Sequence, residues 1–203
     1  MLRRGTARHT FQELDTILDS VGASLSLTAG RDEMGFGGRA LAEDADLLIA
    51  LLSDMLLHPS FAQQEIDKLR GQLLTHLGIL DTDTGYRADR AFMSALYPKD
   101  HPYARPVVGT RETLGALTRE SLVAFYSEYY HPTSLVISVV GAIDSGRILE
   151  ALETSLGQWQ VVGLPPVRHI PPAQTPAGIT QRRVQLPDKS QVDMILGVVA
   201  MPR

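Results

Sequence analysis

The feature that most constrains this chain is a run of apolar residues at positions 45–57, ADLLIALLSDMLL. The run spans 13 residues and contains two aspartates, whereas a membrane-spanning helix needs about 20 apolar residues. Residues 45–57 are therefore predicted to form a helix buried inside a folded protein. The helix is expected to end before Pro59, because proline cannot continue a helix.

Amphipathic segments on both sides of this run predict an α+β fold. Thr10 and Glu13 have the spacing of a capping box at the start of a helix that Gly22 ends. Residues 23–30, ASLSLTAG, alternate with a period of two and predict an antiparallel hairpin with residues 35–42, GFGGRALA. The same reasoning predicts helices over residues 61–83, 84–98, 117–132 and 144–159, and a central strand over residues 134–143, SLVISVVGAI.

A change in composition and periodicity near residue 160 predicts a domain boundary. Residues 161–178 contain five of the twelve prolines and little periodicity, which is typical of an extended linker. Residues 179–201 predict two strands around the turn PDKS. We expect residues 1–160 to form most of one α+β domain whose first strands and helix are missing, residues 161–180 a linker, and residues 181–203 the opening strands of a second, truncated repeat.

Composition excludes several classes of function. The chain has 19 Lys and Arg against 23 Asp and Glu, and its basic residues are scattered. Nucleic acid binding needs a concentrated basic face, so we expect no nucleic acid partner. The absence of cysteine excludes disulfides, thiolate metal sites and thiol nucleophiles. The N-terminal residues lack the apolar stretch of a secretory signal, and we expect no membrane span; the compartment is left unknown.

The six histidines do not form a recognisable metal-binding motif. None lies in H-x-x-E-H or H-E-x-x-H, and the chain has no G-x-S-x-G elbow or Walker loop. His58 and His131 each precede a proline at a predicted helix end, where a cation is favoured by the helix dipole. His9 and His169 are expected to be solvated. His76 flanks the apolar stripe of its helix and is expected to be packed or partly solvated rather than a ligand.

The segment HPYARPVVGT, residues 101–110, has two interpretations. Its histidine, tyrosine and arginine lie within five residues, as in an active site. Alternatively, Pro102 and Pro106 stiffen a loop, Gly109 permits its turn, and Thr110 caps a helix that begins RETLGALT. We expect the second interpretation to hold, with the polar side chains tying the loop to its neighbours.

Seven segments follow one another along the chain: RGT, LDSVGASLSLTAGRDEM, LAEDADLLIALLSDMLLHPSF, EIDKLRGQLL, ALYPKDHPYARPVVGT, LTRESLVAFYSEYYHPTSLVISVVGAID and SLGQW. In this order they resemble the pitrilysin/insulinase-type zinc metallopeptidases, which include mitochondrial processing peptidase. The resemblance covers about residues 4–160, and residues 181–203 look like the first strands of the family's next repeat. It implies a metallopeptidase-like α+β domain with a largely antiparallel sheet covered by helices, in a protein whose similar domains enclose a chamber.

Active members of that family bind zinc through H-x-x-E-H and a later glutamate, and this chain does not show these residues at the matching positions. The motif would end just before Met1. The helix of the later glutamate places His76 at the ligand position, and Leu69 replaces a usual acidic residue. The edge strand that holds substrate, usually N-A-x-T, corresponds to Ser26–Ala29. We therefore assign no catalytic or metal-binding residue in this chain and name no individual substrate-binding residue.

These departures predict the non-catalytic, inactive-domain type of the family. Such a domain or subunit would help enclose and bind a peptide substrate beside a catalytic partner, in a dimer or pseudo-dimer, with residues 23–30 as the expected peptide contact. Zinc is expected only in that partner. Two alternatives stay open. The chain is part of an active zinc endopeptidase with its H-x-x-E-H elsewhere, or it has a structural assembly role like core proteins of respiratory complexes.

Overall fold

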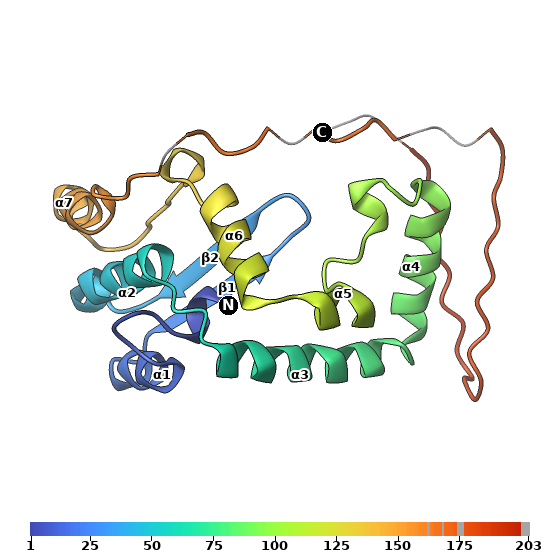
Figure 1. The fold of residues 1–203 in the computed structure, drawn as a ribbon, viewed down its shortest axis with the longest axis horizontal. Helices are drawn as coiled ribbons and strands as arrows, with labels where there is room; N and C mark the ends of the chain where they lie inside the picture. The colour runs from blue at the N-terminus through green and yellow to red at the C-terminus, as the bar shows by residue number, and fades with distance from the viewer. Residues whose placement is uncertain (162, 168, 174–176, 200–203) are drawn as a thin grey trace. The chain divides into compact units, whose positions relative to one another are not determined.

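A computed structural model describes residues 1–161, 163–167, 169–173 and 177–199 (Figure 1). The chain divides into two compact units. The first unit consists of Met1–Leu69 and Leu117–Val167, and the second of Arg70–Ala116 and the described part of residues 168–203. The helix α3, Gln63–Leu80, begins in the first unit and ends in the second.

Helix α1, Phe11–Ser20, begins with the capping box that the sequence predicts. The Thr10 hydroxyl accepts the Glu13 backbone N–H at 3.3 Å, and the Glu13 carboxylate accepts the Thr10 backbone N–H at 2.7 Å. Both bonds satisfy donors that the first turn of a helix leaves free. Gly22 follows the helix with φ of 62°, a left-handed conformation that glycine adopts without steric cost. The predicted helix and both of its ends are confirmed.

The predicted hairpin is also confirmed. Strand β1, Ser24–Ala29, pairs antiparallel with β2, Met34–Arg39, in a register that sets Ser24 opposite Arg39 and Ala29 opposite Met34. Because side chains alternate between the two faces of a strand, Leu25 and Leu27 of β1 turn toward the helices while the residues between them turn away.

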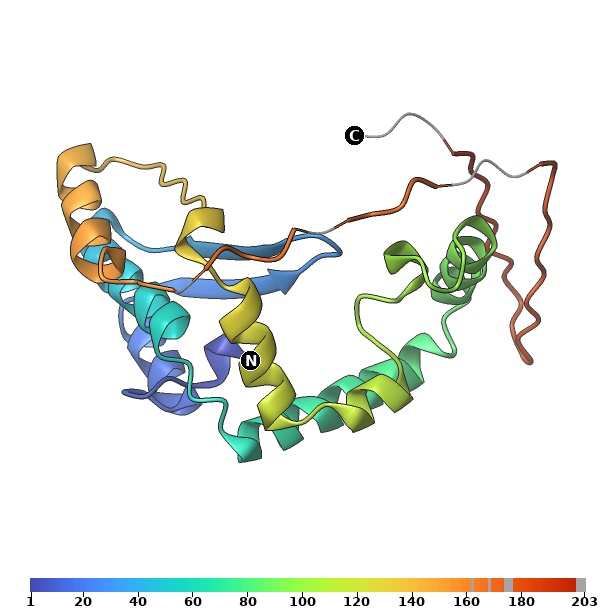
Figure 2. The same ribbon diagram turned by 45° about the horizontal axis from the view of Figure 1, so that its top comes forward.

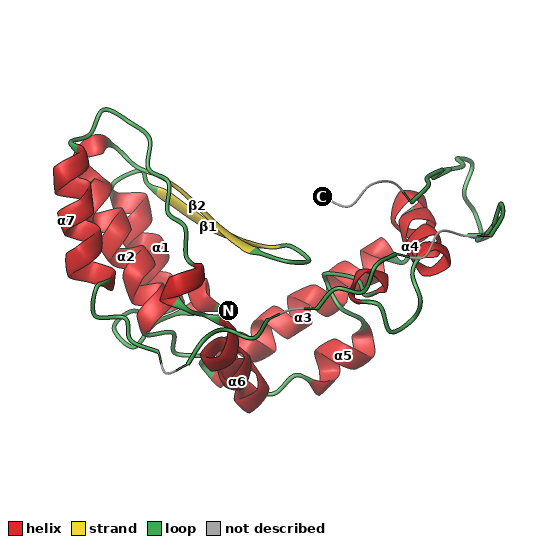
Figure 3. Cartoon of the chain, turned by 90° about the horizontal axis from the view of Figure 1, so that it is seen from above, coloured by secondary structure: helices red, strands yellow, loops and turns green. Residues whose placement is uncertain are grey.

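The apolar run forms helix α2, Ala45–Leu57, as predicted. Its residues Leu51 and Met55 pack with Leu14 and Leu18 of α1 and with Leu25 of β1. Figure 3 shows α1 and α2 on the same side of the hairpin. The two helices therefore cover the apolar face of β1, and this cluster is the first of two hydrophobic cores in the first unit.

A second hydrophobic core lies at the other end of α2. It consists of Leu2, Leu56, Phe61 and Ile66, all buried. Half-buried residues of later elements pack against it, including Leu122 and Tyr126 from the middle of the chain and the chain's one tryptophan, Trp159. This core therefore joins the N-terminal 3-10 helix to segments more than 100 residues later in the sequence.

The remaining helices of the first unit have the predicted order. Helix α6 begins at the Thr118 capping box, and the Asp144 side chain accepts the Arg147 backbone N–H at 2.8 Å to cap α7. Helix α7, Ser145–Leu156, packs along α2 (Figure 1). Arg147 of α7 donates to Asp46 of α2 at 2.7 Å. The further elements of this unit are η1 (Leu2–Arg4), η2 (Ala42–Asp44), α6 (Arg119–Tyr129), η4 (Pro132–Ser134) and α7 (Ser145–Leu156).

The second unit is built from short helices and extended chain. After α3, Asp83 accepts the Tyr86 backbone N–H at 2.6 Å and caps α4, as expected for an aspartate in this turn. The described residues from 177 to 199 include a stretch that runs beside α4 (Figures 1 and 2). Gln191 in this stretch donates to Thr84 of α4 at 2.7 Å. The further helices of this unit are α4 (Thr84–Leu96), η3 (Pro102–Ala104) and α5 (Arg111–Ala116).

Two strand predictions are wrong for the described residues. Residues 135–140, predicted as a central strand, form no β-ladder, and Val136 and Val140 are 91% and 94% exposed. The described residues of 179–199, predicted as two strands, also form none. A strand needs a neighbouring strand to complete its backbone hydrogen bonds, and β1 and β2 are the only strands among the described residues.

The fold class is the predicted one, α+β with an antiparallel sheet and covering helices, although the described sheet has two strands. Among the described residues, no helix is long and apolar enough to span a membrane. The predicted limits of a domain over residues 1–160, a linker over 161–180 and a further repeat over 181–203 stay a prediction.

Candidate functional site

The outer face of the hairpin carries alternate residues of the segment expected to contact peptide, residues 23–30. Ser24, Ser26 and Thr28 of β1 are exposed in a row, while Leu25 between them is 5% exposed. Among the described residues, β1 pairs only with β2, so its second edge has no neighbouring strand. An extended peptide can add to an edge of this kind through main-chain hydrogen bonds.

Glycines of β2 keep this outer face flat. Gly37 lies opposite Ser26, and Gly35 lies opposite Thr28. A Cβ atom added at Gly35 would lie 2.8 Å from the Thr28 hydroxyl oxygen, and one at Gly37 would lie 3.3 Å from that of Ser26. Ser26 and Thr28 therefore face positions of β2 that have no side chain, whereas Ser24 faces Arg39, and the glycines let another backbone come close to this part of the hairpin.

One end of the free edge of β1 is already engaged by the N-terminal segment. The Arg3 guanidinium donates from Nε to the Leu25 carbonyl oxygen at 2.9 Å. The same guanidinium forms an ion pair of 2.6 Å with Asp15 on α1. Arg3 therefore connects η1, the hairpin and α1, and the part of β1 from Ser26 to Ala29 is the part that remains for a ligand.

His76 does not assemble a metal site with other described residues. It is exposed on α3, and the half-buried Leu69 lies on the same helix. The described residues contain no group of three His, Cys, Asp or Glu that could hold a metal ion together. These residues alone do not fit a zinc centre. The predictions of no metal ligand and no zinc in this chain remain predictions.

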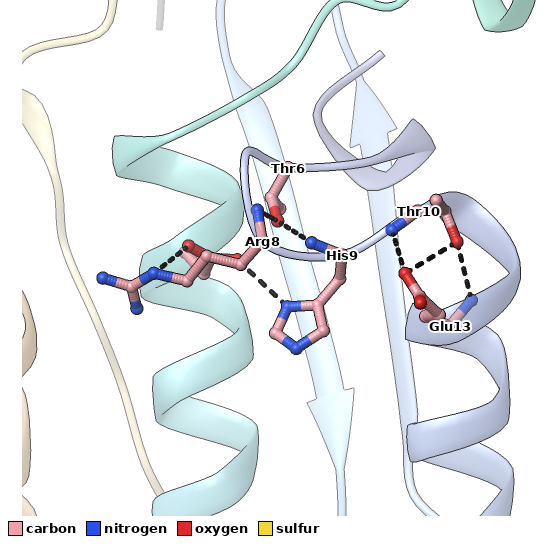
Figure 4. A network of polar contacts seen from close by, with 6 residues as sticks. Thr6, Arg8, His9, Thr10 and Glu13 are labelled. Atoms are coloured by element: carbon pink, nitrogen blue, oxygen red, sulfur yellow. Dashed lines mark hydrogen bonds and ion pairs between the residues drawn. The ribbon is translucent and has the colours of Figure 1, made fainter.

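A buried carboxylate beside a histidine is a feature that the sequence did not predict. Asp54 is 5% exposed in the apolar run, and its Oδ2 lies 3.3 Å from Nδ1 of His9. Its Oδ1 lies 3.7 Å from Nε of the exposed Arg8 and has no hydrogen bond. Thr6 holds this loop by accepting the backbone N–H groups of Arg8 and His9 (Figure 4). The expectation that His9 is solvated is only partly met, because its side chain is 32% exposed and its ring also contacts the buried Asp54 carboxyl group.

A second buried carboxylate, Glu65, is fully paired. It is 8% exposed, and it accepts from Lys68 at 2.7 Å and from Arg4 at 3.4 Å. The hydrogen bond from Lys68, followed by the charge of Lys68 and the contact with Arg4, holds the pKa of Glu65 below the ordinary value of a glutamate. Glu65 is therefore a structural anion that ties α3 to the N-terminal segment.

A tyrosine beside the hairpin stays protonated. Tyr130 contacts the Met34 sulfur through its hydroxyl group. Burial, with a smaller contribution from Tyr126, raises the pKa of Tyr130 to about 12. Near neutral pH this phenol is an uncharged group that packs against the base of β2 and has no acid–base role there.

The loop HPYARPVVGT is a clamp, as its second interpretation predicts. His101 is 4% exposed, and its Nδ1 accepts the Tyr103 backbone N–H at 3.1 Å. Because Nδ1 is an acceptor, Nε2 carries the proton and donates to the Pro171 carbonyl oxygen at 2.9 Å. The His101 ring also stacks on Tyr97 with 4.5 Å between the ring centroids. Both ring nitrogens are occupied, so His101 has no free nitrogen for catalysis.

The ends of this loop also have structural roles. Arg90 donates to the Ala104 carbonyl oxygen at 3.0 Å, and Gly109 turns the chain with φ of 80°. Thr110 accepts the Thr113 backbone N–H at 3.2 Å at the start of α5. The expectation that the loop holds a turn and caps a helix is confirmed.

Family models match both parts of the chain. Residues 1–111 match the model described as insulinase, peptidase family M16, which is more than half of the chain. The chain belongs to the insulinase family of peptidases. Residues 116–203 match the model described as the peptidase M16 inactive domain. The resemblance to pitrilysin/insulinase-type metallopeptidases, and to their inactive domains, is therefore confirmed.

Curated relatives in the family are named as zinc proteases. An uncharacterized zinc protease of Mycobacterium leprae is 26% identical over 163 residues, which cover 80% of this chain and 36% of the relative. An uncharacterized zinc protease of Streptomyces coelicolor is 26% identical over 155 residues, covering 76% of this chain and 34% of the relative. The chain thus spans little more than a third of the length of these relatives.

Solved structures of the family share the fold. The peptidase M16 inactive domain from Pseudomonas fluorescens superimposes with a TM-score of 0.76 at 22% identity, covering 87% of this chain and 42% of that chain. The first half of the periplasmic protease PqqL from Escherichia coli has a TM-score of 0.70 at 20% identity, covering 84% and 38%. At such identities the match supports the fold alone, and the M16-like α+β fold is confirmed.

Proposed function

We propose that this chain is a non-catalytic domain or subunit of an M16 zinc peptidase, and that it binds peptide substrate beside a catalytic partner. The hairpin carries this proposal. Ser26 and Thr28 of β1 face glycines of β2, and the second edge of β1 has no neighbouring strand among the described residues. A surface of this form suits an extended peptide, because backbone groups supply the affinity and few side chains obstruct the approach.

Two residues of α3 support the non-catalytic assignment. His76 is exposed, and Leu69 is apolar at a position where the resemblance implies an acidic residue in active members. A catalytic zinc site needs three protein ligands that converge and leave one position for water. The chemistry is therefore assigned to a partner domain or subunit, which would form a dimer or pseudo-dimer with this chain.

The first experiment measures peptide hydrolysis by the full-length protein alone and mixed with a partner of the family that carries H-x-x-E-H. We expect hydrolysis only in the mixture and its loss when a chelator removes zinc. Chelator-sensitive hydrolysis by the protein alone would refute the non-catalytic assignment.

The second experiment tests the hairpin through Gly37→Val. Valine is favoured in strands, so the variant should fold, but its side chain would project from the flat outer face beside Ser26. We expect a rise of about tenfold in the KM of the mixture, equivalent to about 1.4 kcal/mol of binding free energy, with kcat unchanged. The control Thr16→Val changes an exposed residue of α1 and should leave KM unchanged. An unchanged KM for both variants would remove the hairpin from the proposal.

A second candidate function is a zinc peptidase in which this chain is one part of an active polypeptide. The observation that favours it is the length comparison, because the chain covers 36% and 34% of relatives that are named zinc proteases. An H-x-x-E-H motif encoded in the same polypeptide, together with hydrolysis by that polypeptide without any partner, would favour this candidate over the first.

A further inference from the structure

The second unit contains a cavity of about 650 Å³ that the proposed peptide site does not use. The end of α3, the helices α4 and α5, and residues Arg182–Val184 of the extended chain line it. Leu77, Ala91 and Pro106 provide apolar wall, and the rest of the lining is largely polar. A volume of this size suits a ligand of a few residues, since small-molecule sites occupy about 300–1,000 Å³.

Positive charge dominates the lining of this cavity. Five arginines face two carboxylates, so the positive charges exceed the negative ones by three. The chain as a whole has the opposite balance, with 19 basic against 23 acidic residues. The positive potential is therefore a local property of the cavity. The five residues are Arg87, Arg90, Arg111, Arg182 and Arg183.

The five arginines differ in the hydrogen bonds and ion pairs that they already make within the chain. Asp81 pairs with Arg111 at 3.1 Å and lies 3.9 Å from Arg87. Arg90 is oriented by its bond to the Ala104 carbonyl oxygen. Within the described part of the chain, Arg182 and Arg183 make no hydrogen bond or ion pair. These two guanidinium groups are thus available to a ligand.

The chemistry of the lining selects the class of ligand. Guanidinium groups bind carboxylates through paired N–H donors, which favours a ligand with more than one carboxylate. Asp81 and Glu112 lie in the same cavity, so a ligand whose carboxylates are spaced along a chain can reach the arginines and avoid these two side chains better than a compact polyphosphate can. Arg182–Val184 form no strand, so their backbone groups can bond to the main chain of a peptide.

We propose that this cavity binds an acidic stretch of peptide, with two or three neighbouring Asp or Glu side chains held mainly by Arg182 and Arg183. The proposal rests on the proposed function only in taking a peptide as the ligand. It adds a preference for acidic sequence, which the flat polar face of the hairpin does not supply.

The experiment measures fluorescence anisotropy of a dye-labelled peptide GSDEDGS with blocked ends, added to the full-length protein without a catalytic partner. The reference peptide GSNQNGS has the same shape and no charge. We expect binding of the acidic peptide at least tenfold tighter than that of the neutral one, and a loss of affinity as salt increases.

Matched variants locate the binding. Arg182→Gln with Arg183→Gln removes two exposed charges that have no partners among the described residues, so the fold should persist, and affinity should fall at least tenfold. The control, Lys99→Gln with Lys189→Gln, removes two exposed charges of the same unit that do not line the cavity, and affinity should stay within twofold. Equal losses in both double variants would show general charge attraction and overturn the proposal.

Two further results would also overturn it. Equal affinity for the two peptides would show that charge is not recognised, and tighter binding of inorganic tripolyphosphate than of the acidic peptide would make the cavity a small-anion site. The binding experiment does not measure hydrolysis, so it is independent of the test of the proposed function. Binding of the acidic peptide without hydrolysis in the partner mixture would support the proposed cavity site and refute the proposed function. Activity in the mixture without acidic-peptide binding would do the reverse.

Discussion

The two units of this chain are held together by different interactions. In the first unit, two hydrophobic cores bring α1, α2, β1 and the later helices together. In the second unit, Leu77 and Leu114 are the buried hydrophobic residues among those described, and the loop around His101 is held by hydrogen bonds and ring contacts. Apolar burial stabilises in proportion to area, whereas a hydrogen bond stabilises only when its geometry is kept. We therefore expect mutations to act differently in the two units.

The largest effect should come from the first hydrophobic core. Leu14 is 0% exposed among Leu18, Leu25, Leu51 and Met55. Leu14→Ala removes buried methyl groups and leaves a cavity, which should cost about 3 kcal/mol of the free energy of unfolding. Urea denaturation measures the loss.

The control for this variant is Leu149→Ala on α7, where the leucine is 60% exposed. It should change the free energy of unfolding by less than about 0.5 kcal/mol. If Leu14→Ala and Leu149→Ala lower the free energy of unfolding by similar amounts, the stability of the first unit does not depend on apolar burial, and the proposed difference between the two units is wrong.

A smaller effect is expected from the clamp of the second unit. His101→Ala removes the acceptor of the Tyr103 backbone N–H, the donor to the Pro171 carbonyl oxygen and the stacking on Tyr97. The cost should be about 2 kcal/mol, because two hydrogen bonds and a ring contact are lost together. Hydrogen exchange of backbone amides should show faster exchange in residues 97–110 and unchanged exchange in α1 and α2.

His101→Asn sharpens this test, because its side-chain oxygen can still accept the Tyr103 backbone N–H although it is too short to reach Pro171. We expect an intermediate loss of protection. Exchange that is equally fast in both variants would show that the bond to the Tyr103 N–H contributes little, and that the Pro171 bond and the stacking on Tyr97 supply the stabilisation.

The smallest expected effect on stability at neutral pH comes from the contact of Glu65 with Lys68 and Arg4 in the first unit. Because its partners lower the pKa of Glu65 in the folded state, the ionised carboxylate stabilises the fold at a pH above the unfolded pKa of about 4.3. That stabilisation should decline as pH falls from this value through the lowered pKa, where the folded carboxylate finally takes up a proton.

Thermal unfolding between pH 6 and pH 3 checks this expectation. Glu65→Gln should flatten the decline in melting temperature, and Glu33→Gln, at an exposed position, should leave it as in the unmodified protein. If both variants follow the unmodified protein, the acid response arises from other carboxylates and not from the contact of Glu65 with Lys68 and Arg4.

Local interactions could be predicted from the sequence, and distant ones could not. The Thr10, Thr118 and Asp144 caps join residues three apart, so the sequence alone shows both partners. The hairpin follows in the same way from the alternation in residues 23–30. For the same reason, the roles of Pro102, Gly109 and Thr110 in their loop were predictable.

The failures all involve partners that are far apart along the chain. Asp54 meets His9 across 45 residues, and His101 meets the Pro171 carbonyl across 70. The only hint of the first contact was a charged residue inside an apolar run, which demands a partner but does not name it. The predicted strand over residues 134–143 failed for a related reason, since an apolar, β-branched pattern does not itself supply a neighbouring strand.

The single tryptophan gives this molecule a built-in optical reporter. Trp159 packs against the second hydrophobic core of the first unit, and the chain contains no other tryptophan. Its emission on denaturation therefore follows that unit, whereas far-ultraviolet circular dichroism follows the helices of both. Coincident unfolding curves from the two signals would show that both units unfold in one cooperative step. Separate curves would give each unit its own midpoint without any label being attached.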